Sequence, residues 1–326
     1  TLSLHDALPI YRTEFQRDYD RLIFSAPFRR LQNKTQVFPL PGSIFVHNRL
    51  THSLEVSCVG RSLGNKIASE LLKLHPELHD THISEIGSIV SAACLAHDLG
   101  NPPFGHSGEK AISTYFSEGQ GMALKKELSP MEWDDLTHFE GNANAFRILT
   151  HQFEGRRKGG FVMTYSTLAS IVKYPFSSQL AGKKSKFGFF LSEEADYQKI
   201  AGELGIIRLS KPDEPLRYAR HPLVYLVEAA DDICYQMMDI EDAHKLKLLT
   251  HDETKGLYMQ FFDEKRRKRI EEVCRIVTDV NEQIAYLRSS VIGALIKECT
   301  RVFTENEARS EEHTSELQSP RYLVCR

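Results

Sequence analysis

A strongly apolar helix that ends at a histidine and an aspartate is the feature that most constrains the fold of this chain. Ile, Val, Ala and Cys recur at helical spacing over residues 86–96, and His97-Asp98 follows directly. The next residues, Gly100-Asn101-Pro102-Pro103, are strong helix-stop signals. Two adjacent side chains of the metal-ligand type are therefore held rigidly at a helix end, where the chain turns sharply.

Helical periodicity dominates the rest of the chain as well. Leu, Val and Ile three to five residues apart predict a helix near 52–74. Further helices are predicted over Ser107–Tyr115, 139–153, 165–174 and 221–249, the last being the longest, with two more within 252–305. Strand signals are short and are confined to 35–38, 44–46, 188–191 and 205–209. The predicted fold class is mostly α, a helical bundle with small β decorations.

Composition narrows the range of partners. The 326 residues suffice for a large buried core, and the net charge of −3 gives no general reason to expect nucleic acid or an acidic membrane. No stretch approaches the ~20 apolar residues of a membrane span, and the six cysteines form no CxxC pair. We expect a cytoplasmic protein with buried, reduced cysteines. The basic run 264–269 is interpreted as a solvated face, which leaves an accessory contact with single-stranded nucleic acid open.

Both ends of the chain resemble translated sequencing adapters. Residues 1–10 read TLSLHDALPI and residues 309–319 read RSEEHTSELQS. We therefore expect 1–10 and 309–326 to be adapter-like artefacts that add almost nothing to the core, and we expect the native protein to continue in both directions.

The dipeptide His-Asp is a weak signal by itself, and its context separates its four occurrences. Those at 5–6, 79–80 and 251–252 lie in the adapter-like segment or in polar loops, whereas 97–98 closes an apolar helix. A divalent cation needs several nitrogen and oxygen ligands that converge from different elements. His52, at the start of the predicted helix 52–74, is a candidate partner for His97 and Asp98.

A carboxylate on the long helix completes this candidate set. Asp231 is flanked by Ala, Ile and Cys, where an unpaired charge would be costly to bury and a metal would remove that cost. Tyr235 and Asp239 follow at i+4 and i+8, so the three side chains form one stripe on the helix.

A histidine and a carboxylate at the start of the next helix suit acid–base chemistry. His106 and Glu109 are three residues apart, close enough for the carboxylate to orient or charge the imidazole. Gly105 and Gly108 allow the backbone to approach a ligand closely. Beside a metal, such a pair can take a proton from water or give a proton to a leaving oxygen.

The ordered motifs resemble the HD-superfamily deoxyguanosine triphosphate triphosphohydrolases and related dNTPases. The family pattern H…HD…D falls on His52, His97-Asp98 and Asp231. The surrounding blocks match over 29–38, 49–56, 93–109, 139–143 and 228–242. The resemblance covers 11–250 as an HD phosphohydrolase domain, and 251–308 would begin a C-terminal helical region that is largely missing.

The resemblance implies a reaction and roles for the candidate residues. It implies one divalent metal ion, Mg²⁺ or Mn²⁺, with these ligands: His52, His97, Asp98 and Asp231. His106 with Glu109 would assist the attack of metal-activated water on the α-phosphorus of a dNTP, dGTP being the best guess. The products would be the deoxynucleoside and triphosphate.

The resemblance also implies substrate contacts and an assembly. The deoxyribose and its 3′-hydroxyl would be surrounded by Gln36, Tyr235 and Asp239. The phosphates would be contacted by Arg49, Asn142 and Lys173. The family further suggests a homo-oligomer and gives no role for a membrane.

Three alternatives remain at this stage. The first is an HD hydrolase of another nucleotide phosphate ester. The second is a regulator that binds nucleotide or single-stranded nucleic acid without turnover. The third is a purely structural helical protein. The sugar-contact set argues against the first and the intact ligand set against the second. Base preference, metal identity, nucleotide activation and oligomeric state are not determined by the sequence.

Overall fold

Two antiparallel helices, α3 (Arg49–Leu74) and α4 (Ile86–Ala96), form the centre of the fold. Their axes approach closely, because a Cβ on Gly64 would lie 2.7 Å from the Cα of Gly87. Every residue of α4 except Ser88 is buried, as its all-round apolar sequence predicts. The antiparallel packing brings the first turn of α3 beside the end of α4, where His97 follows.

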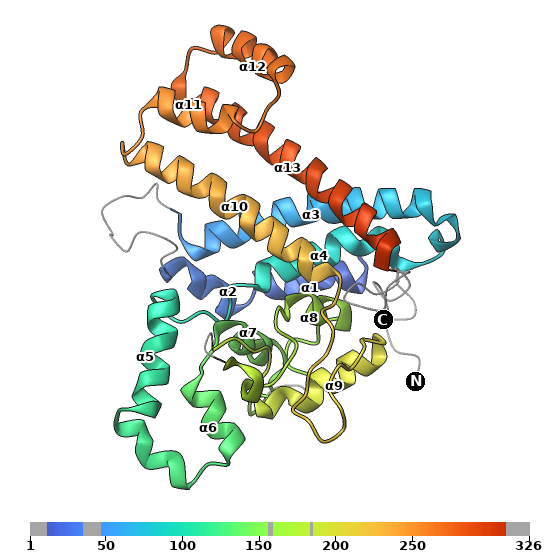
Figure 1. Cartoon of the computed structure of the whole chain (residues 1–326), viewed down its shortest axis with the longest axis vertical. Helices are drawn as coiled ribbons and strands as arrows, with labels where there is room; N and C mark the ends of the chain where they lie inside the picture. The colour runs from blue at the N-terminus through green and yellow to red at the C-terminus, as the bar shows by residue number, and fades with distance from the viewer. Residues whose placement is uncertain (1–11, 35–46, 156–158, 183–184, 311–326) are drawn as a thin grey trace.

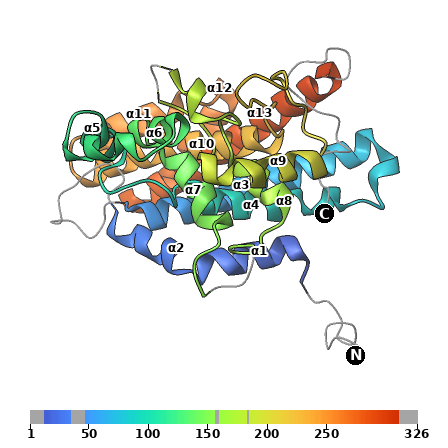
Figure 2. The same ribbon diagram turned by 90° about the horizontal axis from the view of Figure 1, so that it is seen from below.

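The computed structural model describes residues 12–34, 47–155, 159–182 and 185–310, with side chains as far as 306. Several other helices pack around the central pair. Helix α10 (Leu223–Lys245) and helix α13 (Val280–Ser310) pack on α3, while α1 (Glu14–Ile23) and α8 (Tyr165–Ile171) pack on α4 (Figure 1). Figure 2 shows α1 along one edge, next to the layer of α3 and α4. The remaining α-helices are α2 (Ala26–Arg30), α5 (Gly105–Ser117), α6 (Pro130–Thr137), α7 (Gly141–Thr150), α9 (Glu194–Glu203), α11 (His251–Met259) and α12 (Glu264–Ile276).

The predicted mostly α fold is confirmed, with differences at some helix ends. Helix α3 begins at Arg49 instead of 52, because the Asn48 side chain accepts a hydrogen bond from Thr51 N (3.0 Å) and caps the helix. Residues 252–305 contain parts of three helices, not two. Asp263 caps α12 and the Asp279 side chain accepts from Glu282 N (2.8 Å) near the start of α13. Helix α13, with 31 residues, is longer than α10, so the prediction of the longest helix was wrong.

The β decorations are smaller than predicted. Segment 188–191 forms no strand and leads into a 3₁₀ turn, whereas 205–209 contributes one isolated bridge, between Arg208 and Tyr218. The other two predicted strands, 35–38 and 44–46, lie outside the described residues. Extended pairing elsewhere among the described residues is limited to isolated bridges such as Phe176 with Arg217.

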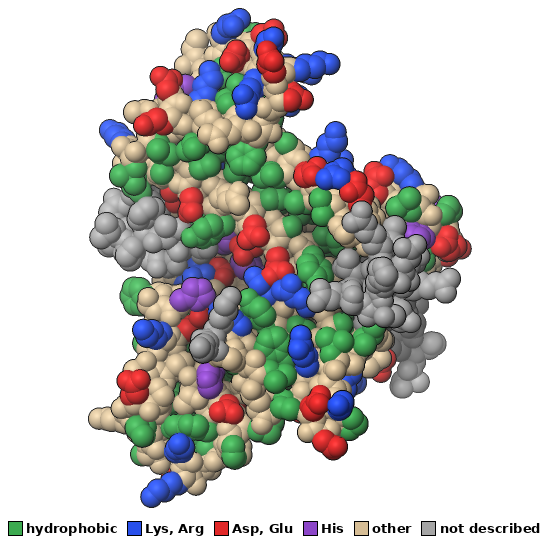
Figure 3. Space-filling view, in the orientation of Figure 1, with side chains coloured by type: hydrophobic (Ala, Val, Ile, Leu, Met, Phe, Trp, Pro, Cys, Tyr) green, Lys and Arg blue, Asp and Glu red, His purple; other side chains and the backbone are tan. Residues whose placement is uncertain are grey.

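Several other expectations can be compared with the structure. Each residue of the basic run 264–269 is exposed on α12, as predicted, and Figure 3 shows charged side chains gathered at that end of the molecule. Of the described cysteines, Cys94, Cys234 and Cys274 are buried free thiols, whereas Cys58 is exposed. No described helix has the length and the apolar character that a membrane span requires. The adapter-like ends lie outside the described residues, apart from 309–310 at the end of α13.

A buried histidine ties the start of α3 to α10. His47 Nδ1 lies 2.7 Å from Asp242 Oδ1, and His47 Nε2 lies 3.2 Å from Glu55 Oε1. Burial lowers the pKa of His47, but the hydrogen bonds to Asp242 and Glu55 outweigh it and raise the pKa to about 9. The imidazole is therefore protonated at neutral pH and links two carboxylates on different helices.

We expect His47→Gln to destabilise the protein by about 1–3 kcal/mol at pH 6, because Asp242 loses a charged partner. The folded-state pKa of about 9 lies above the ordinary value of 6.5, so the stabilisation is complete below pH 6.5 and is lost as the pH rises through 9. Urea unfolding at pH 6, 8 and 10 measures this difference, with the exposed His79→Gln as control. A difference between wild type and His47→Gln that does not shrink by pH 10 would contradict the assignment.

Candidate metal centre and pocket

Three of the four predicted metal ligands meet between α3 and the end of α4. His52 lies in the first turns of α3, and His97 and Asp98 follow α4 directly. One donor atom from each of the three lies within 4.8 Å of the others. His52 is completely buried, and only 13% of the His97 side chain and 7% of the Asp98 side chain are exposed.

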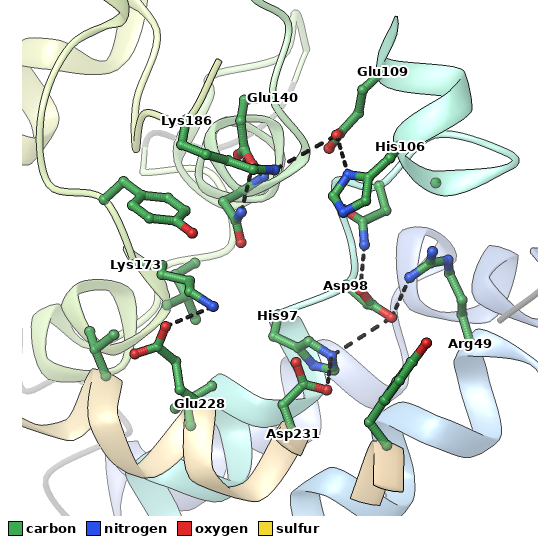
Figure 4. A pocket seen from close by; sticks show the side chains of 18 of the residues that line it. Arg49, His97, Asp98, His106, Glu109, Glu140, Lys173, Lys186, Glu228 and Asp231 are labelled. Carbon is green, nitrogen blue, oxygen red and sulfur yellow. Dashed lines mark hydrogen bonds and ion pairs between the residues drawn. The ribbon is translucent and has the colours of Figure 1, made fainter. Parts of the chain in front are cut away.

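Asp231 on α10 adjoins this set through both histidines. Its Oδ1 lies 3.0 Å from His52 Nε2 and 3.6 Å from His97 Nε2. On the other side of His97, Nε2 lies 3.7 Å from Asp98 Oδ2. The four predicted ligands thus come from three separate elements and lie next to one another, and Figure 4 shows His97, Asp98 and Asp231 of this set.

The charges of the cluster stabilise one another. Burial raises the pKa of Asp231, but His97 and the hydrogen bond with His52 outweigh burial and lower it to about 2. Burial lowers the pKa of His97, while the carboxylates of Asp98 and Asp231 raise it above its ordinary value. Asp231 is therefore ionised at neutral pH, as a carboxylate that binds a cation must be.

The donor set fits a divalent cation. His97 Nδ1 donates to the Cys94 carbonyl oxygen at 2.6 Å, which leaves Nε2 directed at the two aspartates. A backbone carbonyl on the second nitrogen is the usual arrangement of a metal-binding histidine. Two imidazoles and two carboxylates combine donors that suit transition metals with donors that suit Mg²⁺ and Mn²⁺.

Arg49 and Asn101 hold the Asp98 carboxylate in place. Arg49 Nη1 donates to Asp98 Oδ2 at 2.6 Å, and the Asn101 side-chain amide donates to Asp98 Oδ1. Arg49 is predicted to contact phosphate, and it does line the cavity, but in this structure its guanidinium is also a buried partner of Asp98. One side chain therefore connects the metal cluster with the cavity.

The predicted acid–base pair faces the same cavity. His106 Nδ1 lies 2.7 Å from Glu109 Oε2, and Glu109 Oε1 accepts from Gly141 N at 2.9 Å. The imidazole side chain is 84% exposed, while that of Glu109 is 12% exposed. Glu109 is thus fixed by a second helix and orients an imidazole that remains open to a ligand.

Cationic side chains line a cavity of about 660 Å³ between α5, α8, α10 and the metal cluster. Lys173 Nζ lies 2.7 Å from Glu228 Oε1, and Lys186 Nζ lies 2.8 Å from Glu140 Oε1. Figure 4 shows both lysines on the wall opposite His97. Lys173 and Asn142, two predicted phosphate contacts, are among the lining residues.

Comparisons with known proteins agree with this geometry. A family model described as the HD domain matches residues 49–174. A deoxyguanosinetriphosphate triphosphohydrolase-like protein of Synechocystis is 39% identical over 316 residues, which cover 91% of this chain and 68% of the relative. The chain belongs to the HD-domain family of deoxyguanosinetriphosphate triphosphohydrolase-like proteins.

Other members of this family match over large parts of the chain. The triphosphohydrolase-like protein of Pseudomonas aeruginosa is 48% identical over 264 residues, covering 78% of this chain and 57% of the relative. A protein of Yersinia enterocolitica named deoxyguanosinetriphosphate triphosphohydrolase is 31% identical over 353 residues, covering 93% of this chain and 66% of the relative. The chain thus spans between just over half and about two thirds of the length of these relatives.

The sugar contacts that the triphosphohydrolase family implies are only partly assembled. Tyr235 lines the cavity one turn after Asp231 and is 46% exposed. Asp239 lies further along α10 and does not line it, although its Oδ1 is buried without a hydrogen-bond partner among the described residues. Gln36 lies outside the described residues.

The sequence did not predict five of the charged or aromatic residues that line the cavity in this family member. These residues are Phe104, Glu140, Tyr174, Lys186 and Glu228. No local pattern in the sequence distinguishes Lys186 from a solvated lysine. Glu140 and Glu228 lie in sequence blocks that match the family. Glu140 lies at the start of a predicted helix and Glu228 shares the predicted helix of Asp231, and these positions were the signals that could have identified them as site residues.

Proposed function

We propose that the protein hydrolyses a deoxynucleoside triphosphate, with dGTP the preferred substrate, to the deoxynucleoside and triphosphate in a metal-dependent reaction. One observation carries the proposal: the cluster of His52, His97, Asp98 and Asp231 borders the same cavity as the His106–Glu109 pair, and three cationic side chains line that cavity. The names of the curated relatives support it.

The cluster and the acid–base pair have complementary tasks in this reaction. A divalent cation held by the two histidines and two aspartates would polarise a phosphoryl oxygen and lower the pKa of a water molecule. Hydrolysis transfers the oxygen of that water to the α-phosphorus and breaks the bond from phosphorus to O5′. In this proposal His106, oriented by Glu109, gives the proton that the departing O5′ requires.

Charge and spacing favour attack at the α-phosphorus. Arg49, Lys173 and Lys186 lie on the cavity wall, each held by a carboxylate, where their charged groups can contact a polyphosphate. Tyr235 follows Asp231 by one helical turn, roughly 6 Å at 1.5 Å per residue. A nucleoside held against Tyr235 keeps the α-phosphorus, which is bonded to its O5′, beside the cluster. The γ-phosphorus then lies further away.

A substrate panel tests the proposal. The protein is incubated with one nucleotide at a time, in Mg²⁺ or Mn²⁺ and with a chelator as control, and the products are separated by ion exchange. We expect deoxynucleoside and triphosphate from a dNTP, less turnover of the ribonucleotide, and none with chelator. Orthophosphate or a nucleoside monophosphate as the first product would instead indicate an HD hydrolase of another phosphate ester, and binding without products would indicate a regulator.

A further inference from the structure

A buried glutamate caps the helix that forms one wall of the cavity. Glu140 is completely buried at the N-terminus of α7, where its Oε2 accepts from Asn142 N at 2.5 Å and from Ala143 N at 3.3 Å. These are backbone donors of a first helical turn, which have no partner within the helix. The carboxylate therefore satisfies the start of α7.

The same carboxylate orients two side chains that line the cavity. Its Oε1 accepts from Asn142 Nδ2 at 2.8 Å and from Lys186 Nζ at 2.8 Å. Burial lowers the pKa of Lys186, but Glu140 and Glu109 outweigh it and raise the pKa above its ordinary value. Lys186 thus stays charged, and Glu140 and Asn142 fix its position.

The first turn of α7 also contacts Glu109 of the acid–base pair and the chain segment that follows the predicted metal ligand Asp98. Gly141 N donates to Glu109 Oε1 at 2.9 Å, and Asn144 Nδ2 donates to the Gly100 carbonyl oxygen at 2.8 Å. The backbones leave no space, because a Cβ on Gly100 would lie 2.0 Å from the Gly141 oxygen. A shift of this turn would therefore move Glu109 and the chain that follows Asp98.

We propose that Glu140 is a positioning residue for the phosphate side of the cavity, one that orients Asn142 and Lys186 and fixes the first turn of α7. This inference rests on the proposed function, because it assigns these two side chains to the polyphosphate of the substrate. Glu140 also lines the cavity, but its carboxylate oxygens are occupied by these two side chains and by the start of α7, so the proposal gives it no contact with a reacting atom.

Two substitutions separate the tasks of Glu140. Glu140→Gln keeps the length of the side chain and removes the charge that Lys186 and the helix donors face. Glu140→Asp keeps a residue that is favoured at helix N-caps, but it is one methylene too short to hold Lys186. The matched control is Glu193→Gln, because Glu193 is an equally buried carboxylate that pairs with Arg147 outside the cavity.

Kinetics and hydrogen exchange measure the effects on the metal-loaded enzyme. We expect both Glu140 variants to raise KM for dGTP about 10–100-fold with a smaller change in kcat, as the loss of a charged hydrogen-bond partner predicts. Amide exchange over 141–144 should accelerate in Glu140→Gln and stay slow in Glu140→Asp. Glu193→Gln should alter neither KM nor the exchange of 141–144.

The outcomes distinguish this inference from the proposed function. An unchanged KM in either Glu140 variant, or an equal rise in Glu193→Gln, would overturn the positioning role. If the wild type hydrolyses no nucleotide, the proposed function fails. The positioning role is then tested separately, by calorimetric measurement of the binding of inorganic tripolyphosphate with Mn²⁺. Weaker binding by both Glu140 variants supports the positioning role, whereas equal binding, or no binding by the wild type, contradicts it.

Discussion

The Asp231→Ala protein is expected to lose metal-dependent turnover while its helices remain folded. Asp231 Oδ1 contacts both imidazoles of the cluster and is the only predicted ligand that α10 provides. Substitution of a group that only orients a metal ligand typically lowers metal affinity or activity about 10–100-fold. The loss of a ligand itself should therefore lower turnover more than about 100-fold. Alanine favours helix, so α10 should persist. Turnover in saturating Mn²⁺ and circular dichroism measure the two effects.

The neighbouring carboxylate supplies the control. Asp232 lies next to Asp231 on α10 but is exposed and belongs to neither the cluster nor the cavity lining. Asp232→Ala should retain turnover within a few-fold and should bind Mn²⁺ as the wild type does. Turnover near the wild-type level in Asp231→Ala would show that this aspartate does not hold the metal.

The second large effect is expected from His106→Ala, which should lower kcat by about 10²–10⁴-fold, the usual contribution of a general acid or base. The imidazole contacts Glu109 and lines the cavity, and it is not part of the cluster of predicted metal ligands. Metal affinity should therefore be unchanged, which Mn²⁺ titration measures. Exposed His79→Ala is the control for removal of an imidazole.

A different kinetic pattern would assign His106 another role. A higher KM with an unchanged kcat would make it a phosphate contact. Loss of Mn²⁺ affinity would make it part of the metal site. Only a lower kcat with retained metal agrees with proton transfer to the leaving oxygen.

Local sequence was sufficient for the elements whose burial and ends are encoded in their own residues. Helix α4 carries its apolar character and its stop signals within residues 86–103, and the prediction of that helix is confirmed. The division of 252–305 was not predicted, because Asp263 and Asp279 are ordinary polar residues until their side chains cap a helix. The β segment 188–191 was over-predicted from apolar residues that are buried in loops.

The candidate site likewise contains residues that the local sequence predicts and residues that it does not. His52, His97 and Asp98 were selected because histidine and aspartate at helix ends suit a cation, and the fold does bring them together. Lys186 was missed, because its role depends on Glu140, 46 residues away in the sequence and 2.8 Å away in space. Pairing across such a separation depends on tertiary packing and leaves no mark on local periodicity.

Hydrolysis of dGTP in ¹⁸O-labelled water, with Mn²⁺ bound, tests the central claim most directly. The account predicts that ion exchange and mass spectrometry find deoxyguanosine and intact triphosphate as the first products. The label should lie in the triphosphate, because water attacks the α-phosphorus and O5′ leaves with the nucleoside. Label in the deoxyguanosine, or orthophosphate or dGMP as the first product, would contradict the assigned reaction even if the four ligands hold the metal.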